Sequence, residues 1–233
     1  MSCARVLLVG GGITSAVTAS LLAEAAPSLR LTVWDKARGA GGRMSTARGR
    51  TARTQVDTGA QYVSSTPDMY RAHGDIYAAL LESGVLAPAN TSAILGMREE
   101  RLAEGEATRH FVAPDGMSSL VKHFFKLSGA ELNFGRRVAE VIKVGHLQIF
   151  TMIMDNGDTF IDKLTFRLWP QGEDVWRVRT ECGLEDVFDA VVLTMPVPQL
   201  LALSGDVPQL ISAAPGLREG LEKVSYTWLF RVN

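Results

Sequence analysis

The strongest constraint on the fold lies near the start of the chain, where an apolar run meets three consecutive glycines. Residues 5–9 form a short run rich in branched apolar side chains, which favours a strand buried on both faces of a parallel sheet. Glycines occupy positions 10–12, and residues 13–26 then carry apolar side chains at helical spacing. Residues 29–34 predict a second strand, which stops at Asp35. The order strand, glycine turn, helix and strand predicts the start of an α/β, Rossmann-like domain.

The glycine turn has nearly the pattern of a dinucleotide-binding turn. Gly10-x-Gly12-x-x-Ser15 places serine where the third glycine usually stands. The first glycine permits a tight turn, the second lets backbone N–H groups approach a pyrophosphate, and the third allows close helix packing, for which serine is small enough. Asp35 follows about twenty residues later, where a carboxylate accepts hydrogen bonds from ribose hydroxyls. The pattern predicts a nucleotide site; the alternative is a plain tight turn with a solvated aspartate.

Residues 36–54 contain six basic and no acidic residues, so we predict a loop of positive charge. Within it, the cluster Gly41-Gly42-Arg43-Met44 has paired glycines, which let a backbone approach a ligand closely. Arg43 is suited to pair with a phosphate or to face a flavin ring. A flexible basic loop is the alternative interpretation.

The rest of the chain predicts a mixture of helices and strands. Helices are expected at 75–83 and 118–128, closed by Gly84 and Gly129. The predicted extended segments are 110–113, 132–144, a hairpin at 148–168 with its turn at Asn156-Gly157, a second one at 176–195, and a buried strand at 190–193.

Composition excludes several classes of function. Lys and Arg number 24 against 25 Asp and Glu, so the net charge of −1 provides no field for nucleic acid or an acidic membrane. Apolar stretches are shorter than the roughly 20 residues that span a bilayer. Cys3 and Cys182 favour reduced thiols, with a single disulfide as the alternative. The histidines lack metal-ligand spacing, so we expect no metal site, and no pattern identifies a catalytic acid, base or nucleophile.

Several motifs, in this order, resemble the flavin amine oxidase superfamily. They are residues 6–12, Asp35, Gly41-Gly42-Arg43-Met44, Asp57-x-Gly59-Ala60-Gln61-Tyr62 and Thr194-Met195-Pro196. Within the superfamily, residues 33–37, 59–62, 116–119 and 192–198 are most similar to the renalase family. The resemblance covers most of residues 4–143 and again about 174–226.

This resemblance implies an FAD-binding domain with Rossmann-like topology and a second, substrate domain, in a p-hydroxybenzoate-hydroxylase-like architecture. It implies an FAD-dependent oxidase that converts dihydro isomers of NAD(P)H, reduced at the 2- or 6-position, to NAD(P)+, while O2 becomes H2O2. The partners would be that dihydronicotinamide dinucleotide and O2. Oxidation of amines such as catecholamines is an alternative activity. Neither chemistry requires a side-chain acid or base, because the flavin accepts the hydride.

The resemblance also implies which residues contact FAD. Those at the pyrophosphate would be Gly10, Gly12, Thr14 and Ser15. Asp35 and Lys36 would lie at the adenosine ribose, and Val138 would contact the adenine through its backbone. Those near the flavin would be Gly42, Arg43, Met44, Gln61 and Tyr62, and Thr194 would close the sheet near the cofactor.

Two departures from the family pattern shape the expected domain organisation. Roughly 27 additional residues occupy about 145–171, and the resemblance ends after Tyr226, where family members continue. We therefore expect a truncated or alternatively spliced form with an incomplete substrate domain. The expected FAD-binding parts are 1–75 and 131–200, and the expected substrate-domain parts are 76–130 and 201–233.

These departures keep other hypotheses open. The chain could be a catalytically inactive isoform that acts as a binding or regulatory fragment. A Rossmann-type NAD(P)-binding reductase is a third hypothesis, against which the 41–44 cluster argues. Family resemblance predicts secretion, and a cytoplasmic flavoenzyme is equally compatible with two cysteines.

Overall fold

The computed structural model describes residues 3–49, 54–90, 107–145 and 175–224 of the 233-residue chain. The predicted hairpin at 148–168 and nearly all of the 145–171 segment therefore lie outside the described residues. The chain divides into two compact units. Unit 1 comprises Met1–Gly10, Ser28–Lys36 and Leu132–Asn233, and unit 2 comprises Gly11–Pro27 and Ala37–Glu131. The two units are defined by compactness alone. The FAD-binding and substrate-domain segments expected from the sequence therefore remain a prediction.

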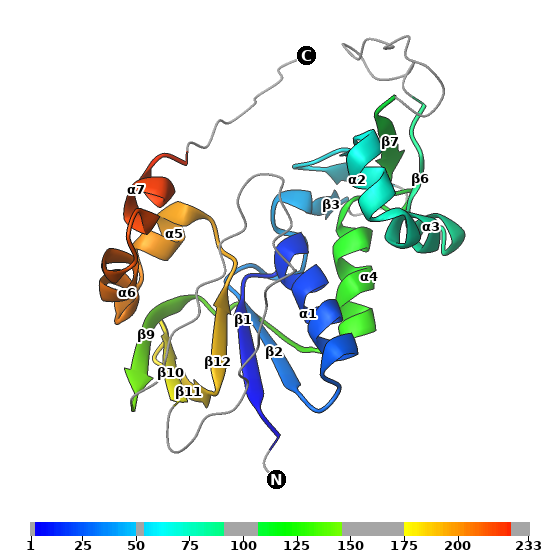
Figure 1. The fold of residues 1–233 in the computed structure, drawn as a ribbon. Coiled ribbons are helices and arrows are strands. Elements are labelled where there is room, and N and C mark those ends of the chain that lie inside the picture. The colour runs from blue at the N-terminus through cyan, green and yellow to red at the C-terminus, as the bar shows by residue number, and fades with distance from the viewer. Residues whose placement is uncertain (1–2, 50–53, 91–106, 146–174, 225–233) are drawn as a thin grey trace. The chain divides into compact units, whose positions relative to one another are not determined.

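Unit 1 contains the predicted parallel sheet, in the strand order β12-β1-β2-β8. These strands are β1 (Arg5–Val9), β2 (Arg30–Asp35), β8 (Glu131–Phe134) and β12 (Ala190–Leu193). β1 pairs in parallel with both neighbours, so that Leu7 lies opposite Val191 on one side and Thr32 on the other. Leu7 and Leu8 are fully buried, as expected for a central strand covered on both faces. The predicted strands at 5–9 and 190–193 are confirmed (Figure 1).

A second, largely antiparallel sheet of unit 1 has the order β11-β10-β9-β13. Its strands are β9 (Val138–Val144), β10 (Val175–Thr180), β11 (Glu185–Phe188) and β13 (Ser204–Gly205). The single extended segment predicted over 132–144 is wrong. Gly135 adopts a φ of 71°, in the left-handed region, and this turn sends β8 and β9 into different sheets. The hairpin predicted over 176–195 is confirmed in β10 and β11.

Three short helices of unit 1 pack against the second sheet. They are α5 (Val197–Leu201), α6 (Val207–Ala213) and α7 (Leu217–Glu222). Val207 and Ile211 join the same buried cluster as Val178 of β10, and Trp34 meets Phe188 edge to face with ring centroids 5.5 Å apart. The sequence patterns did not predict these helices, although α5 and α6 each have proline in their first turn.

Unit 2 has two helices side by side, α1 (Ile13–Ala25) and α4 (Ser118–Ser128) (Figure 1). Ala16 and Ala19 of α1 are fully buried, because small side chains allow close helix packing. α4 ends as predicted at Gly129, with a φ of 60°. α3 (Gly74–Glu82) lies within one residue of its predicted bounds and is followed by Gly84 with a φ of 70°.

The remainder of unit 2 is built from short elements. β3 (Thr46–Arg48) pairs antiparallel with β4 (Gln55–Asp57), and a second sheet has the order β5-β7-β6. The strands of that sheet are β5 (Val63–Ser65), β6 (Ala87–Pro88) and β7 (Arg109–Val112), and the helix α2 (Pro67–Ala72) follows β5. The predicted loop over 36–54 is wrong in part, because it contains the 3-10 helix Gly42–Met44 and β3.

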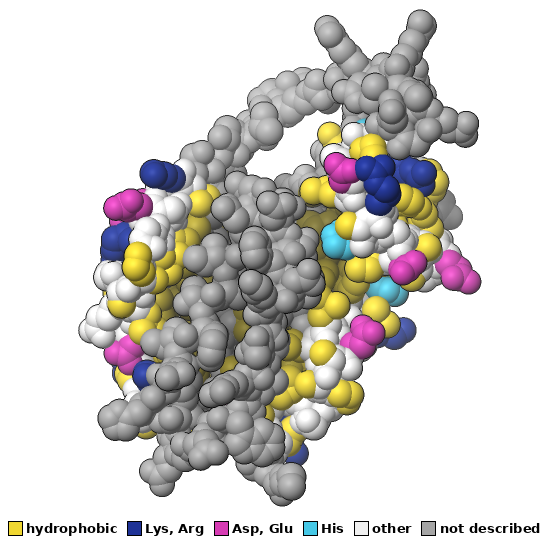
Figure 2. Space-filling model, in the orientation of Figure 1, with side chains coloured by type: hydrophobic (Ala, Val, Ile, Leu, Met, Phe, Trp, Pro, Cys, Tyr) yellow, Lys and Arg dark blue, Asp and Glu magenta, His cyan; other side chains and the backbone are white. Residues whose placement is uncertain are grey.

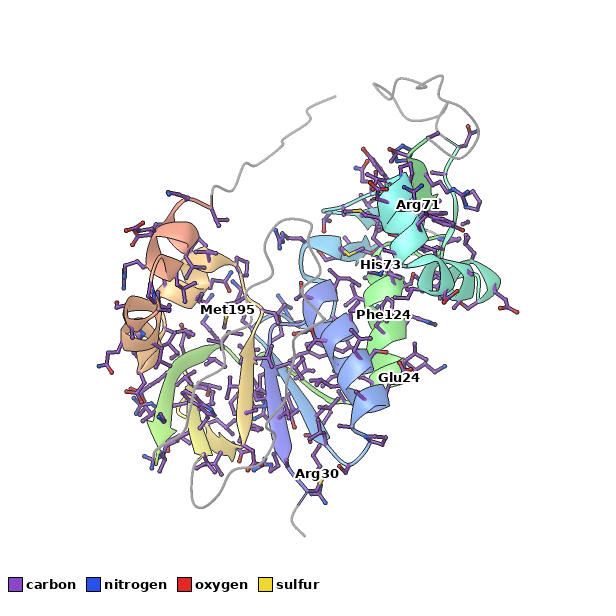
Figure 3. The ribbon with its side chains drawn as sticks, in the orientation of Figure 1. Glu24, Arg30, Arg71, His73, Phe124 and Met195 are labelled. Atoms are coloured by element: carbon purple, nitrogen blue, oxygen red, sulfur yellow. The ribbon has the colours of Figure 1, made fainter. Side chains whose placement is uncertain are left out.

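Side-chain chemistry of the described surface is mixed. Figure 2 shows basic side chains gathered at one end of unit 2, over α2, where Arg71 pairs with Asp68 (Figure 3). Among the described residues, no helix is long and apolar enough to cross a membrane. Within the same ranges, no group of three or more His, Cys, Asp or Glu side chains is arranged to hold a metal ion.

Candidate nucleotide-binding site

The carboxyl ends of three parallel strands meet at Gly10 in unit 1. The Gly10 N–H donates to the Trp34 carbonyl of β2 at 2.8 Å, and the Thr194 N–H donates to the Val9 carbonyl at 3.0 Å. Gly10 has a φ of 124°, and a Cβ there would lie 2.4 Å from the Thr194 hydroxyl oxygen. Only glycine therefore fits this position, and Thr194 is the residue that enforces the tight turn.

A cavity of about 370 Å³ opens at this end of the sheet. Its volume falls within the range of roughly 300–1,000 Å³ that is typical of small-molecule sites. The cavity is lined by Val9, Gly10, Trp34, Asp35, Lys36, Arg136, Arg137, Val138, Ala139, Glu181, Met195, Pro198, Gln199, Ala202 and Leu203. Met195 lies two residues after the end of β12 (Figure 3). The location matches the rule that ligands of open α/β sheets bind outside the carboxyl ends of the strands.

Four residues predicted separately from the sequence meet in this cavity: Gly10, Asp35, Lys36 and Val138. Asp35 ends β2 and is half-buried, whereas Lys36 is exposed. Val138 begins β9, is 8% exposed and belongs to the buried apolar cluster of unit 1. The turn at Gly135, which ends β8, carries the chain to this position.

Two arginines and a glutamate of the cavity lie outside the set predicted from the sequence. The Arg136 N–H donates to the Asp35 carbonyl at 2.8 Å, and its guanidinium lies 5.5 Å from the centre of the Trp34 ring. Arg137 forms an ion pair with Glu181, with Nε and Oε2 3.5 Å apart, and the Glu181 N–H donates to the Arg137 carbonyl at 2.9 Å. The sequence signal for the two arginines was the run Gly135-Arg136-Arg137 directly before Val138, which is also typical of an ordinary solvated surface.

In unit 2, the two glycine clusters predicted from the sequence lie against each other. The Gly41 N–H donates to the Gly11 carbonyl at 2.8 Å. Gly42 has a φ of 54°, and a Cβ there would lie 3.1 Å from the Gly12 Cα. The backbones therefore approach so closely that side chains are excluded from this contact.

Gly12 is also the N-cap of α1, which has no side-chain cap and no acidic residue in its first turn. Backbone N–H groups at such a helix start, together with the positive end of the helix dipole, favour an anion. Thr14 is half-buried there. Ser15, at the position of the third glycine, has no exposed surface, which agrees with the close packing expected of a small residue.

The segments around Arg43 and Tyr62 are also neighbours. The Ala60 N–H donates to the Arg43 carbonyl and the Thr58 N–H to the Ser45 carbonyl, both at 2.9 Å. A Cβ on Gly59 would lie 1.9 Å from the Arg43 carbonyl oxygen, so no other residue fits there. Met44 is buried and anchors the 3-10 helix, while Arg43, at the preceding position, is exposed.

Tyr62 and Gln61 follow this pairing and are exposed, with 37% of the Tyr62 surface accessible. The ring of His110, on β7, meets the Tyr62 ring edge to face with centroids 5.8 Å apart. The His110 Nδ1 is hydrogen-bonded to the Ser64 hydroxyl at 2.9 Å. His110 was not predicted as a site residue, because a single histidine in a strand pattern carries no signal for its cross-strand neighbours.

The structure thus gathers the predicted cofactor-binding residues into two groups. In unit 1, Gly10, Asp35, Lys36 and Val138 line the cavity and Thr194 packs on Gly10. In unit 2, Gly12, Thr14, Ser15, Gly42, Arg43, Met44, Gln61 and Tyr62 lie on the α1 start and the paired segments. Their contacts with a cofactor remain a prediction.

Shifted pKa values occur outside the cavity lining. Hydrogen bonds from Arg5 lower the pKa of Asp186, and the Thr180 hydroxyl lowers the pKa of the exposed Cys182 thiol. Neither side chain lines the cavity. Both cysteines are free thiols, so the predicted alternative of a disulfide does not apply to this structure.

Comparisons with known proteins agree with this geometry. A family model for an NAD(P)-binding Rossmann-like domain matches residues 8–80. Renalase from Mus musculus is 38% identical over 225 residues, which is 96% of this chain and 55% of renalase, so the chain spans little more than half of that relative's length.

A solved structure shares the fold. It comes from Exiguobacterium sp. 255-15 and bears the provisional name protoporphyrinogen oxidase. Its identity to this chain is 15%, the TM-score is 0.56, and the match covers 96% of this chain and 64% of the other. The predicted α/β fold with a Rossmann-like domain is confirmed.

Proposed function

Since this chain is renalase-like across 96% of its length, we propose that it binds FAD non-covalently and acts as a flavin-dependent oxidoreductase. The observation that carries the proposal is the meeting of Gly10, Asp35, Lys36 and Val138 in one cavity at the carboxyl ends of the parallel strands. These four residues lie in three separate parts of the sequence, and a nucleotide explains their convergence.

The adenosine half of FAD is assigned to the cavity of unit 1. The Asp35 carboxylate is suited to accept hydrogen bonds from ribose hydroxyls, while Lys36 and Arg136 supply positive charge beside it. Backbone groups at Val138 and Ala139 offer hydrogen bonds to the adenine edge, and Leu203 with Met195 contributes apolar surface for its faces.

The flavin half is assigned to the paired segments of unit 2, which carry Gly42, Arg43, Met44, Gln61 and Tyr62. The residues present fit such a group. A Cβ on Gly42 would crowd the Gly12 Cα, and exposed Arg43 and Tyr62 stand on adjacent segments. Arg43 would hold a flavin oxygen or phosphate, and Tyr62 would present its ring to the flavin.

When bound, FAD supplies an acceptor for two electrons, which amino-acid side chains cannot provide. The substrate class that we propose is a dihydro isomer of NAD(P)H, reduced at the 2- or 6-position, oxidised to NAD(P)+ with O2 as final acceptor and H2O2 as product. The residues of this chain would bind and orient the reacting rings. Exposed Gln61 and the Tyr62–His110 pair are the groups of unit 2 suited to that role.

Peroxide release tests this function. The purified chain is saturated with FAD and mixed with the 2- or 6-dihydro isomer of NAD(P)H, with ordinary 4-dihydro NAD(P)H and with a catecholamine in parallel. We expect one H2O2 for each 2- or 6-dihydro nucleotide oxidised. Peroxide with the catecholamine alone would overturn the substrate class and favour amine oxidation.

A second candidate function follows from length, since the chain spans only 55% of mouse renalase. In that case the chain binds FAD or a nucleotide and serves as a binding or regulatory fragment. The same experiment separates the two candidates, because a yellow, FAD-bound chain that releases no peroxide with any of the substrates supports the fragment. Binding of a nicotinamide dinucleotide with no affinity for FAD would instead support an NAD(P)-binding reductase.

A further inference from the structure

The start of α4 is capped by side chains from a distant part of unit 2. The Met117 N–H donates to the Asp57 Oδ1 at 2.8 Å, and the Ser118 N–H donates to the Thr46 hydroxyl oxygen at 3.0 Å. The helix N-cap, Met117, provides no side-chain cap of its own. Two of the N–H groups that a helix start leaves unpaired are therefore satisfied by the β3–β4 pair.

Asp57 and Thr46 also bond to each other. They lie directly opposite in the β3–β4 register, and the Thr46 hydroxyl donates to the Asp57 Oδ1 at 2.6 Å. One carboxylate oxygen thus accepts from a hydroxyl and from a helix N–H. A negative charge at the positive end of a helix strengthens both bonds.

The loop before α4 is fitted to the same strands. Gly116 has a φ of 82°, and a Cβ there would lie 2.5 Å from the Thr46 Cγ2. The Gln55 side-chain amide donates to the Pro114 carbonyl at 3.0 Å. The β3–β4 pair is therefore held against the α4 start along its length, as Figure 1 shows for β3 and α4.

The same strand pair leads directly into the two segments assigned to the flavin. Beyond Thr46 and Asp57, the pairing continues through Ser45 and Thr58, whose side-chain oxygens lie 2.9 Å apart, to Arg43 and Ala60. The register fixed at Asp57 therefore sets where the Arg43 carbonyl meets the Ala60 N–H. Tyr62 follows two residues after Ala60.

We propose that Asp57 is a positioning residue for the flavin: by capping α4 and holding Thr46, it fixes the Arg43 and Gln61–Tyr62 segments in the register that contacts the isoalloxazine ring. This inference rests on the proposed function. Asp57 itself is directed to the α4 start and to Thr46, so it acts through the segments on either side. Removing its carboxylate leaves the Met117 N–H and the Thr46 hydroxyl without their acceptor.

The first test uses the protein without cofactor. Amide hydrogen exchange is measured for Met117, Ser118 and Ala60 in the original chain and in the Asp57→Ala, Asp57→Asn and Asp115→Ala variants. Asp115 is the matched control, because its exposed carboxylate lies two residues before Met117 and its side chain makes none of these contacts. We expect exchange about tenfold faster at all three amides in Asp57→Ala. Asp57→Asn keeps the accepting oxygen and should recover most of the protection, and Asp115→Ala should change nothing.

The second test measures FAD in the same variants. We expect Asp57→Ala to bind FAD about tenfold more weakly and to shift the visible flavin spectrum and the flavin reduction potential, while Asp57→Asn stays close to the original. A purely structural role would leave the spectrum and the potential of the bound flavin unchanged. If Asp57→Ala does not fold, Thr46→Val removes the hydroxyl at constant volume and should produce the same changes at Ser118 and Ala60.

The outcomes separate this inference from the proposed function. If the original chain binds no FAD, the proposed function fails, while amide exchange in the cofactor-free chain still shows whether Asp57 fixes the register. If the original chain binds FAD and Asp57→Ala has the same affinity, spectrum and potential, the positioning role is overturned and the proposed function stands.

Discussion

The cavity of unit 1 and the paired segments of unit 2, the two surfaces that we propose for FAD, are built by different means. The cavity presents charged side chains, among them Asp35 at the end of β2 and Arg136 and Arg137 in the connection between β8 and β9. The segments of unit 2 are fitted together by backbone contacts at Gly41, Gly42 and Gly59, where a Cβ has little or no room. The cavity should therefore respond to removal of a charged group, and the segments of unit 2 to addition of a single methyl group.

The largest effect is expected from Gly59→Ala in unit 2. The added Cβ would lie 1.9 Å from the Arg43 carbonyl oxygen, so the two segments must separate. We expect the free energy of unfolding to fall by about 3 kcal/mol, measured by denaturant titration. We also expect loss of bound FAD, measured by flavin absorbance. Gly39→Ala is the matched control, because a Cβ there meets nothing within 4 Å. Equal stability of the two variants would contradict the close contact.

The next effect is expected from Asp35→Ala in unit 1. Loss of a charged acceptor for the ribose hydroxyls should weaken FAD binding by about 2 kcal/mol, or roughly thirtyfold, with little change in stability. Fluorescence titration of FAD measures the affinity. Glu219→Ala, which removes an exposed carboxylate in the first turn of α7, should leave it unchanged. An unaltered affinity in Asp35→Ala would remove the cavity from the account of the site.

A charge pair of unit 1 outside the cavity should affect stability and leave binding intact. Arg5 binds Asp186 through two hydrogen bonds, of 3.0 and 2.7 Å, and they lower the pKa of that carboxyl. Because the pKa is lowered in the folded state, the stabilisation is present above the unfolded value of about 4 and is lost as the pH falls through the folded value.

Asp186→Asn should therefore lower the free energy of unfolding at pH 7 by about 0.5 kcal/mol, since the pair is partly exposed. The difference should disappear in strong acid, and FAD affinity should stay the same. A thermal denaturation series in pH, with FAD titration at pH 7, checks both points. A difference that grows in acid would reverse the assigned sign.

The smallest effect concerns Cys182, an exposed residue that follows Glu181 in the chain and does not line the cavity. The Thr180 hydroxyl lies 3.2 Å from the Cys182 sulfur and lowers the thiol pKa, so more of the reactive thiolate is present near neutral pH. Thr180→Val should slow alkylation of Cys182 about threefold, whereas Thr180→Ser keeps the hydroxyl and the rate. Mass spectrometry of the alkylated peptide measures this, and equal rates in all three chains would refute the assigned cause.

Local sequence patterns predicted helices and strands correctly where a short apolar run ended at a recognisable residue. β1, β12 and α4 have the predicted bounds. The apolar runs of β1 and α4 end at a glycine, and that of β12 ends at Thr194-Met195-Pro196. β3 within the basic loop was not predicted, since its pairing with β4 depends on partners beyond the strand itself. The helices α5 to α7 depend on packing against the Val178 and Phe188 cluster, which no local window contains.

In the candidate site too, residues within local sequence patterns were predicted, and residues that depend on distant partners were not. Gly10 and Asp35 were predictable because Gly10 follows a strand and Asp35 ends one, each with a recognisable sequence pattern. Glu181 reaches the cavity only through the pairing of β10 with β9, whose residues lie far apart in the sequence. Asp57 caps a helix 60 positions further along the chain, and nothing in its local sequence indicates that contact.

Titration of FAD into the purified, cofactor-free chain tests the central claim most directly. Flavin fluorescence and visible absorbance report binding, and circular dichroism confirms that the chain is folded. The account predicts saturable binding of one FAD per chain, with competition by ADP-ribose for the cavity of unit 1. A folded chain that binds no FAD at any FAD concentration that the titration can reach would contradict the account.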